Sequence, residues 1–102
     1  MYQLEYLPAA QRDMVEIVKY ISYELENPST AKKLADDMIS SAEGLTLFPY
    51  TNPIHRAIKP LQHEYRKLII KNYIMFYYID EPSKKVTISR VIYARRDYDT
   101  LL

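Results

Sequence analysis

Residues 64–98, EYRKLIIKNYIMFYYIDEPSKKVTISRVIYARRDY, decide the fold of this chain. They contain three runs rich in Ile, Val, Tyr, Phe and Thr, which are residues that pack well on a pleated surface. The runs cover residues 65–71, 73–80 and 85–93. Turns fall at Lys71-Asn72, where Asn tolerates positive φ, and near Pro82, which cannot donate to a strand ladder. The stretch therefore predicts a three-stranded antiparallel meander.

The alternation of side chains predicts two further features of this meander. The middle run has apolar or aromatic side chains in both phases, so we expect both faces of that strand to be covered. In the third run Val86 and Ile88 share a phase with Arg90, whereas Val91 lies in the other phase. Because Arg is a poor substitute for an apolar core residue, we expect a β-bulge near Ser89 and Arg90 that shifts the phase.

The N-terminal half predicts one strand and two helices. Residues 2–7 alternate and end at Pro8, whose fixed φ suits the first turn of a helix. Asn27-Pro28 ends this helix and begins a second one, with Asn27 as N-cap, and Gly44 is a candidate C-cap. The apolar positions with helical spacing are Met14, Ile17, Val18, Ile21 and Leu25 in the first helix, and Ala31, Leu34, Ala35, Met38, Ala42 and Leu45 in the second.

The predicted fold is a single α+β domain over residues 1–102. It consists of an N-terminal strand, an antiparallel two-helix hairpin, the meander that completes a four-stranded sheet, and a short C-terminal helix or tail. The chain has no cysteine, which excludes disulfides and thiolate chemistry and fits a cytoplasmic protein. The N-terminal residues lack a basic segment followed by an apolar run, and no stretch approaches the ~18 apolar residues needed for a membrane span. We therefore expect a soluble, unexported protein with no membrane partner.

Charge is unevenly distributed, although the net charge is only +1. Residues 1–54 contain four Lys or Arg and eight Asp or Glu, whereas residues 55–102 contain ten and five. The basic sheet half predicts an anionic partner at one surface. The alternative is a solvated sheet edge that lysines keep soluble.

The residue inventory excludes several kinds of site. A single glycine is incompatible with a Walker A loop or a dinucleotide fingerprint. The two histidines lack Cys partners and an HExxH spacing, so we expect neither a metal nor a cofactor. The remaining cationic and aromatic side chains suit RNA, because Lys and Arg neutralise phosphates and Tyr can stack on an unpaired base.

If the domain cleaves RNA, a ribose 2′-OH attacks the adjacent phosphate, and several fixed cations can stabilise the transition state without a metal. Proton transfer also needs an acid and a base. A tyrosine is more often a packed side chain than a catalytic one. The candidates for catalysis are Arg66, Arg95 and Arg96 as cations, and Glu64, Tyr93 and Tyr98 for proton transfer. The candidates for RNA binding are Lys59, Lys67, Lys71, Arg90 and His63. Of these, Lys67 and Arg90 could also serve as catalytic cations, and His63 could serve as an acid or base.

Over nearly its whole length the chain resembles the RelE/ParE superfamily of type II toxin-antitoxin toxins. The resemblance is carried by Leu47-Phe48-Pro49, YRKL at 65–68, the strand at 73–80 and RVIYARRD at 90–97. It implies a compact α+β fold and an intracellular toxin that a cognate antitoxin neutralises in a hetero-oligomer. RelE-like members cleave mRNA in the ribosomal A site without a metal, whereas ParE-like members poison DNA gyrase.

The resemblance also implies roles for particular residues. The basic second-strand position of RelE-like nucleases falls on Arg66, their post-strand arginine falls on Arg95 or Arg96, and Tyr98 lies near their C-terminal tyrosine. The chain departs from many nucleases at Ile74, where they have Arg directly after the third-strand tyrosine. It also has Tyr93 at the end of the last strand, where some members have His.

From these residues we favour a ribosome-dependent, metal-independent mRNA endonuclease. In this hypothesis Arg66 and Arg96 stabilise the phosphorane, and the partners are mRNA, the ribosome and a cognate antitoxin. The alternative is a ParE-like DNA gyrase inhibitor without nuclease activity. For the antitoxin we expect an acidic helical segment, laid across the basic sheet or the helical hairpin.

Overall fold

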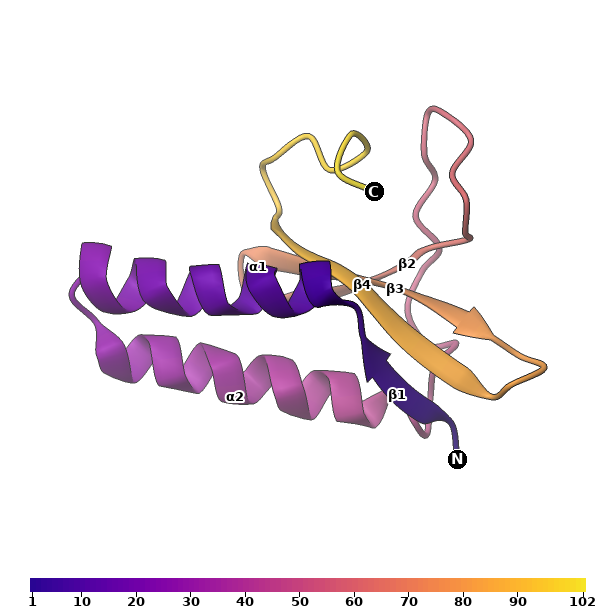
Figure 1. The fold of residues 1–102 in the computed structure, drawn as a ribbon, viewed down its shortest axis with the longest axis horizontal. Coiled ribbons are helices and arrows are strands. Elements are labelled where there is room, and N and C mark those ends of the chain that lie inside the picture. The colour runs from indigo at the N-terminus through magenta and orange to yellow at the C-terminus, as the bar shows by residue number, and fades with distance from the viewer.

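The computed structural model describes residues 1–102 and confirms the predicted α+β architecture (Figure 1). The four strands form one sheet in the order β1-β4-β3-β2, in which β1 runs parallel to β4 and the other pairs are antiparallel. Residues 94–102 form an irregular tail rather than a helix. The elements are β1 (Gln3–Tyr6), α1 (Pro8–Lys19), the π-helical segment η1 (Tyr20–Glu24), α2 (Pro28–Gly44), β2 (Arg66–Ile70), β3 (Tyr73–Asp80) and β4 (Lys85–Tyr93).

The helical hairpin begins and turns where the sequence predicts. Pro8 is the first residue of α1, and Asn27 caps α2 by accepting a hydrogen bond from the Thr30 N–H at 3.2 Å. Between the helices Glu26 adopts a left-handed φ of 50°. Both helices cover the same face of the sheet, with α1 against β4 and α2 against β2. The end of the hairpin that contains η1 projects beyond the sheet (Figure 1).

Two details of the helix ends differ from the prediction. Gly44 is the last residue of α2 and does not adopt positive φ, so it does not act as a left-handed C-cap. Leu25 is 55% exposed instead of buried, because the π-helical segment η1 alters the 3.6-residue spacing on which the predicted apolar stripe depends. None of the helices is both long enough and apolar enough to span a membrane.

The meander has the predicted strands and turns. The turn between β2 and β3 lies at Lys71-Asn72, but Lys71 rather than Asn72 takes the left-handed conformation, with φ of 55°. Along the outer edge of β2, the His55 N–H donates to the Tyr65 carbonyl oxygen and the Lys67 N–H donates to that of Pro53. The connection between α2 and β2 therefore covers part of this edge strand.

The predicted β-bulge lies in β4. Phe76 pairs with Arg90 and Tyr77 pairs with Ile88, so Ser89 is an extra residue without a partner on β3. This extra residue shifts the side-chain alternation. As a result Val86, Ile88 and Val91 all belong to the helix-facing core, whereas Ile92 belongs to the core on the other face.

Each face of the sheet carries a core, as predicted for the middle strand β3. The larger core lies between the sheet and the helices and includes Met38, Met75 and Tyr77, all fully buried. The smaller core lies on the opposite face, where the C-terminal tail and the connection before β2 cover the sheet. Its buried members are Tyr65, Ile74, Phe76 and Ile92, and Leu61, Tyr78, Tyr98, Leu101 and Leu102 pack against them.

Candidate functional site

Arg66 lies on the helix-facing side of the sheet and holds the connection that follows α2. It pairs with Tyr77, whose side chain is in the larger core, and directly opposed residues of an antiparallel pair project to the same face. The Arg66 guanidinium donates to the Asn52 carbonyl oxygen at 2.7 Å and lies 5.0 Å from the centre of the Tyr50 ring. Tyr77 donates to the Pro49 carbonyl oxygen at 2.7 Å. The charge of Arg66 therefore has internal partners.

Arg90 is also engaged within the protein. Its Nε and Nη2 donate to the two carboxylate oxygens of Asp13 at 2.7 and 2.9 Å, and its Nη1 donates to the Leu101 carbonyl oxygen at 3.0 Å. The hydrogen bond to Asp13 is the main reason why the pKa of Arg90 is raised. Bidentate pairs of this kind are among the stronger polar contacts. Arg90, a predicted RNA ligand, thus links α1, β4 and the tail.

The structure does not bring Arg66 together with Arg95 and Arg96. Arg66 is level with Ile88 across the sheet, because both pair with Tyr77. Arg95 and Arg96 follow Tyr93, the last residue of β4. The β3 partners of Ile88 and Tyr93 are Tyr77 and Tyr73, so at ~3.3 Å per residue Tyr93 lies about 13 Å further along the sheet than Ile88. The Arg66 side chain is held at the opposite end, against Tyr50, which donates to Glu81 in the turn between β3 and β4.

A smaller group of predicted residues does come together at the start of β2. The His63 ring stacks on the Tyr78 ring, with centroids 3.8 Å apart and planes at 4°. These rings, together with Glu64 and Arg66, line a hollow of about 130 Å³. An acid, an imidazole, a cation and an aromatic platform therefore share one position at the edge of the sheet.

His55 forms a buried contact with the tail that the sequence analysis missed. Its Nε2 lies 2.6 Å from an Asp99 carboxylate oxygen, and its side chain is only 6% exposed. The ring packs edge-on against Phe76 and Tyr98, at 5.4 and 5.3 Å between centroids. Mainly because of the hydrogen bond to His55, the pKa of Asp99 is lowered. The two partners are 44 residues apart, and no local pattern connects them.

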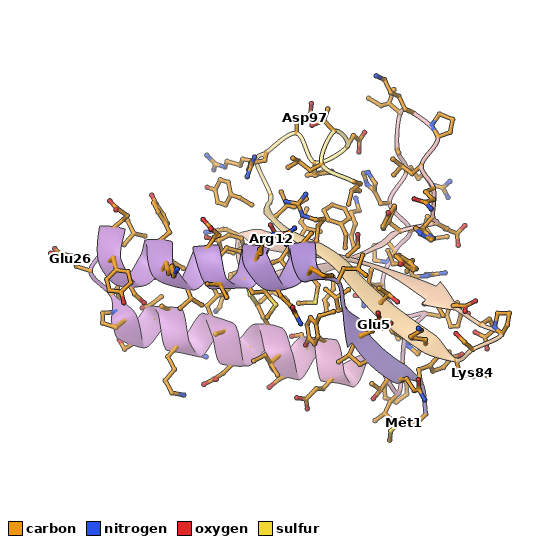
Figure 2. The ribbon with its side chains drawn as sticks, in the orientation of Figure 1. Met1, Glu5, Arg12, Glu26, Lys84 and Asp97 are labelled. Atoms are coloured by element: carbon orange, nitrogen blue, oxygen red, sulfur yellow. The ribbon has the colours of Figure 1, made fainter.

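The other predicted residues lie at several places. Tyr98 packs on Phe76 at 5.1 Å within the smaller core, and Lys67 is paired with the same Phe76 across the strands. Tyr93 is 39% exposed and its ring lies 5.8 Å from that of Tyr73. Among the predicted site residues, the exposed cations without a side-chain hydrogen bond or ion pair are Lys59, Lys71, Arg95 and Arg96. In Figure 2 the tail that carries the two arginines is marked by Asp97.

Comparison with solved structures identifies the class of fold. The chain is similar to one in the chromosomal ParDE toxin-antitoxin system from P. aeruginosa, with a TM-score of 0.74, 18% identity and coverage of 93% of this chain and 98% of that chain. It is also similar to a chain of the RelBE2 toxin-antitoxin complex from Mycobacterium tuberculosis (TM-score 0.62, 20% identity, 90% and 96% coverage). A chain of the archaeal RelE-RelB complex from Pyrococcus horikoshii OT3 gives a TM-score of 0.63 at 9% identity, with 93% and 97% coverage. The fold is that of the RelE/ParE toxins.

The sequence defines the family more closely. Residues 4–98 match the family described as ParE toxin of type II toxin-antitoxin system, parDE. No curated protein matches the chain. Because the family match covers nearly the whole chain, the protein belongs to the ParE toxin family, and it is a toxin of a type II toxin-antitoxin system. This confirms the superfamily resemblance and the toxin class predicted from the sequence.

Proposed function

We propose that this toxin inhibits DNA gyrase by binding it and does not cleave RNA. This conclusion reverses the preference drawn from the sequence. The observation that carries it is the surface of the sheet opposite the helices. An apolar cluster and the chain's own tail fill that surface, whereas a metal-free nuclease needs an open group of converging cations.

The positions of the arginines support the same conclusion. A phosphorane without a metal is stabilised by cations that converge on one phosphate. Arg66 and Arg90 have internal partners, and Arg66 is held away from Arg95 and Arg96. Ile74, which replaces the third-strand arginine of many nucleases, is 6% exposed within the smaller core. The match to the ParE family points in the same direction, because ParE-like members poison DNA gyrase.

The second candidate function is a ribosome-dependent mRNA endonuclease. The stacked pair of His63 and Tyr78, beside Glu64 and Arg66, favours it. In this candidate Glu64 and His63 transfer protons, Arg66 stabilises the developing charge and Tyr78 extends the stack to a base. This group places acid-base and cationic side chains in one hollow.

Two assays run in parallel distinguish the candidates. Purified toxin, freed of antitoxin, is added to gyrase in a DNA supercoiling reaction and to a translation reaction in which mRNA ends are mapped by primer extension. We expect supercoiling to be lost and the message to remain intact. Codon-phased cuts on ribosome-bound message, with normal supercoiling, would instead establish the nuclease.

A matched variant makes this comparison stricter. Glu64→Gln combined with His63→Gln removes the acid-base pair without changing residues of either buried core. If the gyrase proposal holds, the double variant should inhibit supercoiling as strongly as the parent toxin. If the toxin is a nuclease, the double variant should lose mRNA cleavage.

We further propose that a cognate antitoxin covers the helical hairpin and holds the toxin inactive. The hairpin projects beyond the sheet (Figure 1). It exposes large apolar side chains on α1, η1, α2 and the turn between the helices. An amphipathic segment can bury such residues in the manner of a helix in a groove. The exposed residues are Val15, Tyr20, Tyr23, Leu25 and Ile39. Co-expression with the antitoxin should protect amides of the hairpin from hydrogen exchange, and protection confined to the tail would contradict this location.

A further inference from the structure

Three elements meet at the end of the sheet where β4 ends. The Ala94 N–H donates to the Asn72 carbonyl oxygen at 2.8 Å, so the tail begins directly against the turn between β2 and β3. Tyr73 and Tyr93 are cross-strand partners, and their rings lie 5.8 Å apart at 66°. Lys71 precedes this pair in the turn, and Arg95 follows it in the tail.

The helical hairpin contributes Tyr20 to the same place. Burial raises the pKa of Tyr73, and the nearby phenols of Tyr93 and Tyr20 raise it further. Tyr20 is 53% exposed and Tyr93 is 39% exposed. Tyr20 is the first residue of the π-helical segment η1, and π-helical turns are frequent at functional sites. The next residue, Ile21, is buried and anchors the segment.

Lys71, Arg95 and Arg96, at this end of the molecule, are exposed and have no side-chain hydrogen bond or ion pair. The same is true of four cations elsewhere, which are Arg12, Lys19, Arg56 and Lys59. By contrast Arg66 and Arg90 have internal partners. Four lysines elsewhere on the surface each pair with a carboxylate, and they are Lys32, Lys33, Lys84 and Lys85.

We propose that one surface at this end of the molecule contacts the toxin's protein target, and that the target presents acidic residues to it. This tyrosine-arginine surface consists of Tyr20, Tyr73, Tyr93, Lys71, Arg95 and Arg96. Exposed tyrosines and arginines are the residue types that carry most binding energy in protein interfaces. The inference rests on the proposed function and names the part of the toxin that would touch gyrase.

A protein fits this surface better than a nucleic acid does. Proteins that bind nucleic acids through phosphates carry a strongly basic face. This surface instead has three tyrosines beside its three cations. The Tyr73 and Tyr93 rings are inclined at 66° and do not form a flat platform for successive bases.

The test measures the affinity of intact gyrase for purified toxin variants, at low and at high salt. Tyr20→Ala changes η1, and Arg95→Gln combined with Arg96→Gln changes the tail. The matched controls are Tyr23→Ala in η1 and Lys32→Gln combined with Lys33→Gln on α2. Tyr23 is 75% exposed and lies three residues further along η1. All the substituted side chains are exposed, so thermal unfolding should change little in every variant.

We expect each surface variant to weaken binding by about tenfold or more, and each control by less than about twofold. The double arginine variant should also lose most of the salt dependence. If gyrase binds the parent toxin but binds both surface variants equally well, the surface assignment is overturned and the proposed function stands. If gyrase does not bind the parent toxin, the proposed function fails as well. If the surface variants lose affinity for a DNA duplex while keeping that for gyrase, the surface belongs to a nucleic acid and the inference is also overturned.

Discussion

Asp13 accepts hydrogen bonds from both the Arg90 guanidinium and the Val91 backbone N–H, the latter at 2.9 Å. The two donors directly follow the extra residue Ser89, so one carboxylate of α1 satisfies the polar groups on the C-terminal side of the bulge. The partners are 77 residues apart, and their contact ties the first helix to the last strand.

Replacing this carboxylate should therefore destabilise the fold. We expect Asp13→Ala to lower the free energy of unfolding by about 2 kcal/mol, because hydrogen bonds to charged groups are lost and Arg90 is left without its partner. Urea denaturation measures the difference. Asp36→Ala, which removes an exposed carboxylate paired to Lys32, should have little effect. Equal losses in the two variants would mean that Asp13 is merely another surface carboxylate.

Because of the bulge, two single-residue deletions in β4 should have different effects on folding. With Ser89 deleted, Phe76 can still pair with Arg90 and Tyr77 with Ile88 in a regular ladder, so the apolar faces are preserved. With Thr87 deleted, Ile88 would leave the larger core and a serine would enter it, because a one-residue shift reverses the faces. We expect the Ser89 deletion to give a folded protein of lower stability. We expect the Thr87 deletion to give no folded protein. Near-UV circular dichroism of both proteins distinguishes these outcomes.

Acid should weaken the attachment of the tail. The pKa of Asp99 is lower in the folded protein than in an unfolded chain, so protonation favours unfolding. Asp99 thus contributes its full stability above the ordinary aspartate pKa of about 4, and it loses that contribution as the pH falls through the lowered value. Thermal unfolding is measured from pH 6 to pH 2.5. At pH 6 the Asp99→Asn variant should have a lower melting temperature than the parent, and this difference should shrink in acid. A difference that stays constant with pH would show that the carboxylate charge does not stabilise the folded protein.

Loss of the His55 ring should release the tail without unfolding the sheet. The ring fills space between Phe76 and Tyr98 and holds Asp99. We expect His55→Ala to accelerate hydrogen exchange at the Leu101 and Leu102 amides, which donate to the Tyr98 carbonyl oxygen, while amides of β4 keep their protection. His63→Ala is the comparison, since His63 stacks at the edge of the sheet and does not touch the tail through a hydrogen bond. Similar acceleration in both variants would count against a specific role for His55.

The strands could be predicted from the sequence because their residue types and alternation are local properties. The same is true of the bulge, since Arg90 stood in the phase of Val86 and Ile88. The partners of the charged residues could not be predicted, because Asp13, Asn52 and Asp99 reach Arg90, Arg66 and His55 only after the chain has folded. The candidate cations therefore looked equivalent in the sequence. In the structure, Arg66 and Arg90 make contacts that hold the fold together. The predicted cations that are exposed and have no side-chain partner are Lys59, Lys71, Arg95 and Arg96.

The three contacts of Arg90 have a consequence for genetic selection. A screen for mutations that abolish growth arrest recovers every toxin that fails to accumulate in its native form, as well as those that fail to engage a target. Because Arg90 connects α1, β4 and the tail, substitutions at Arg90 or Asp13 will be recovered beside substitutions of contact residues. Co-purification with the antitoxin would separate the two groups, since only a native toxin should still be captured.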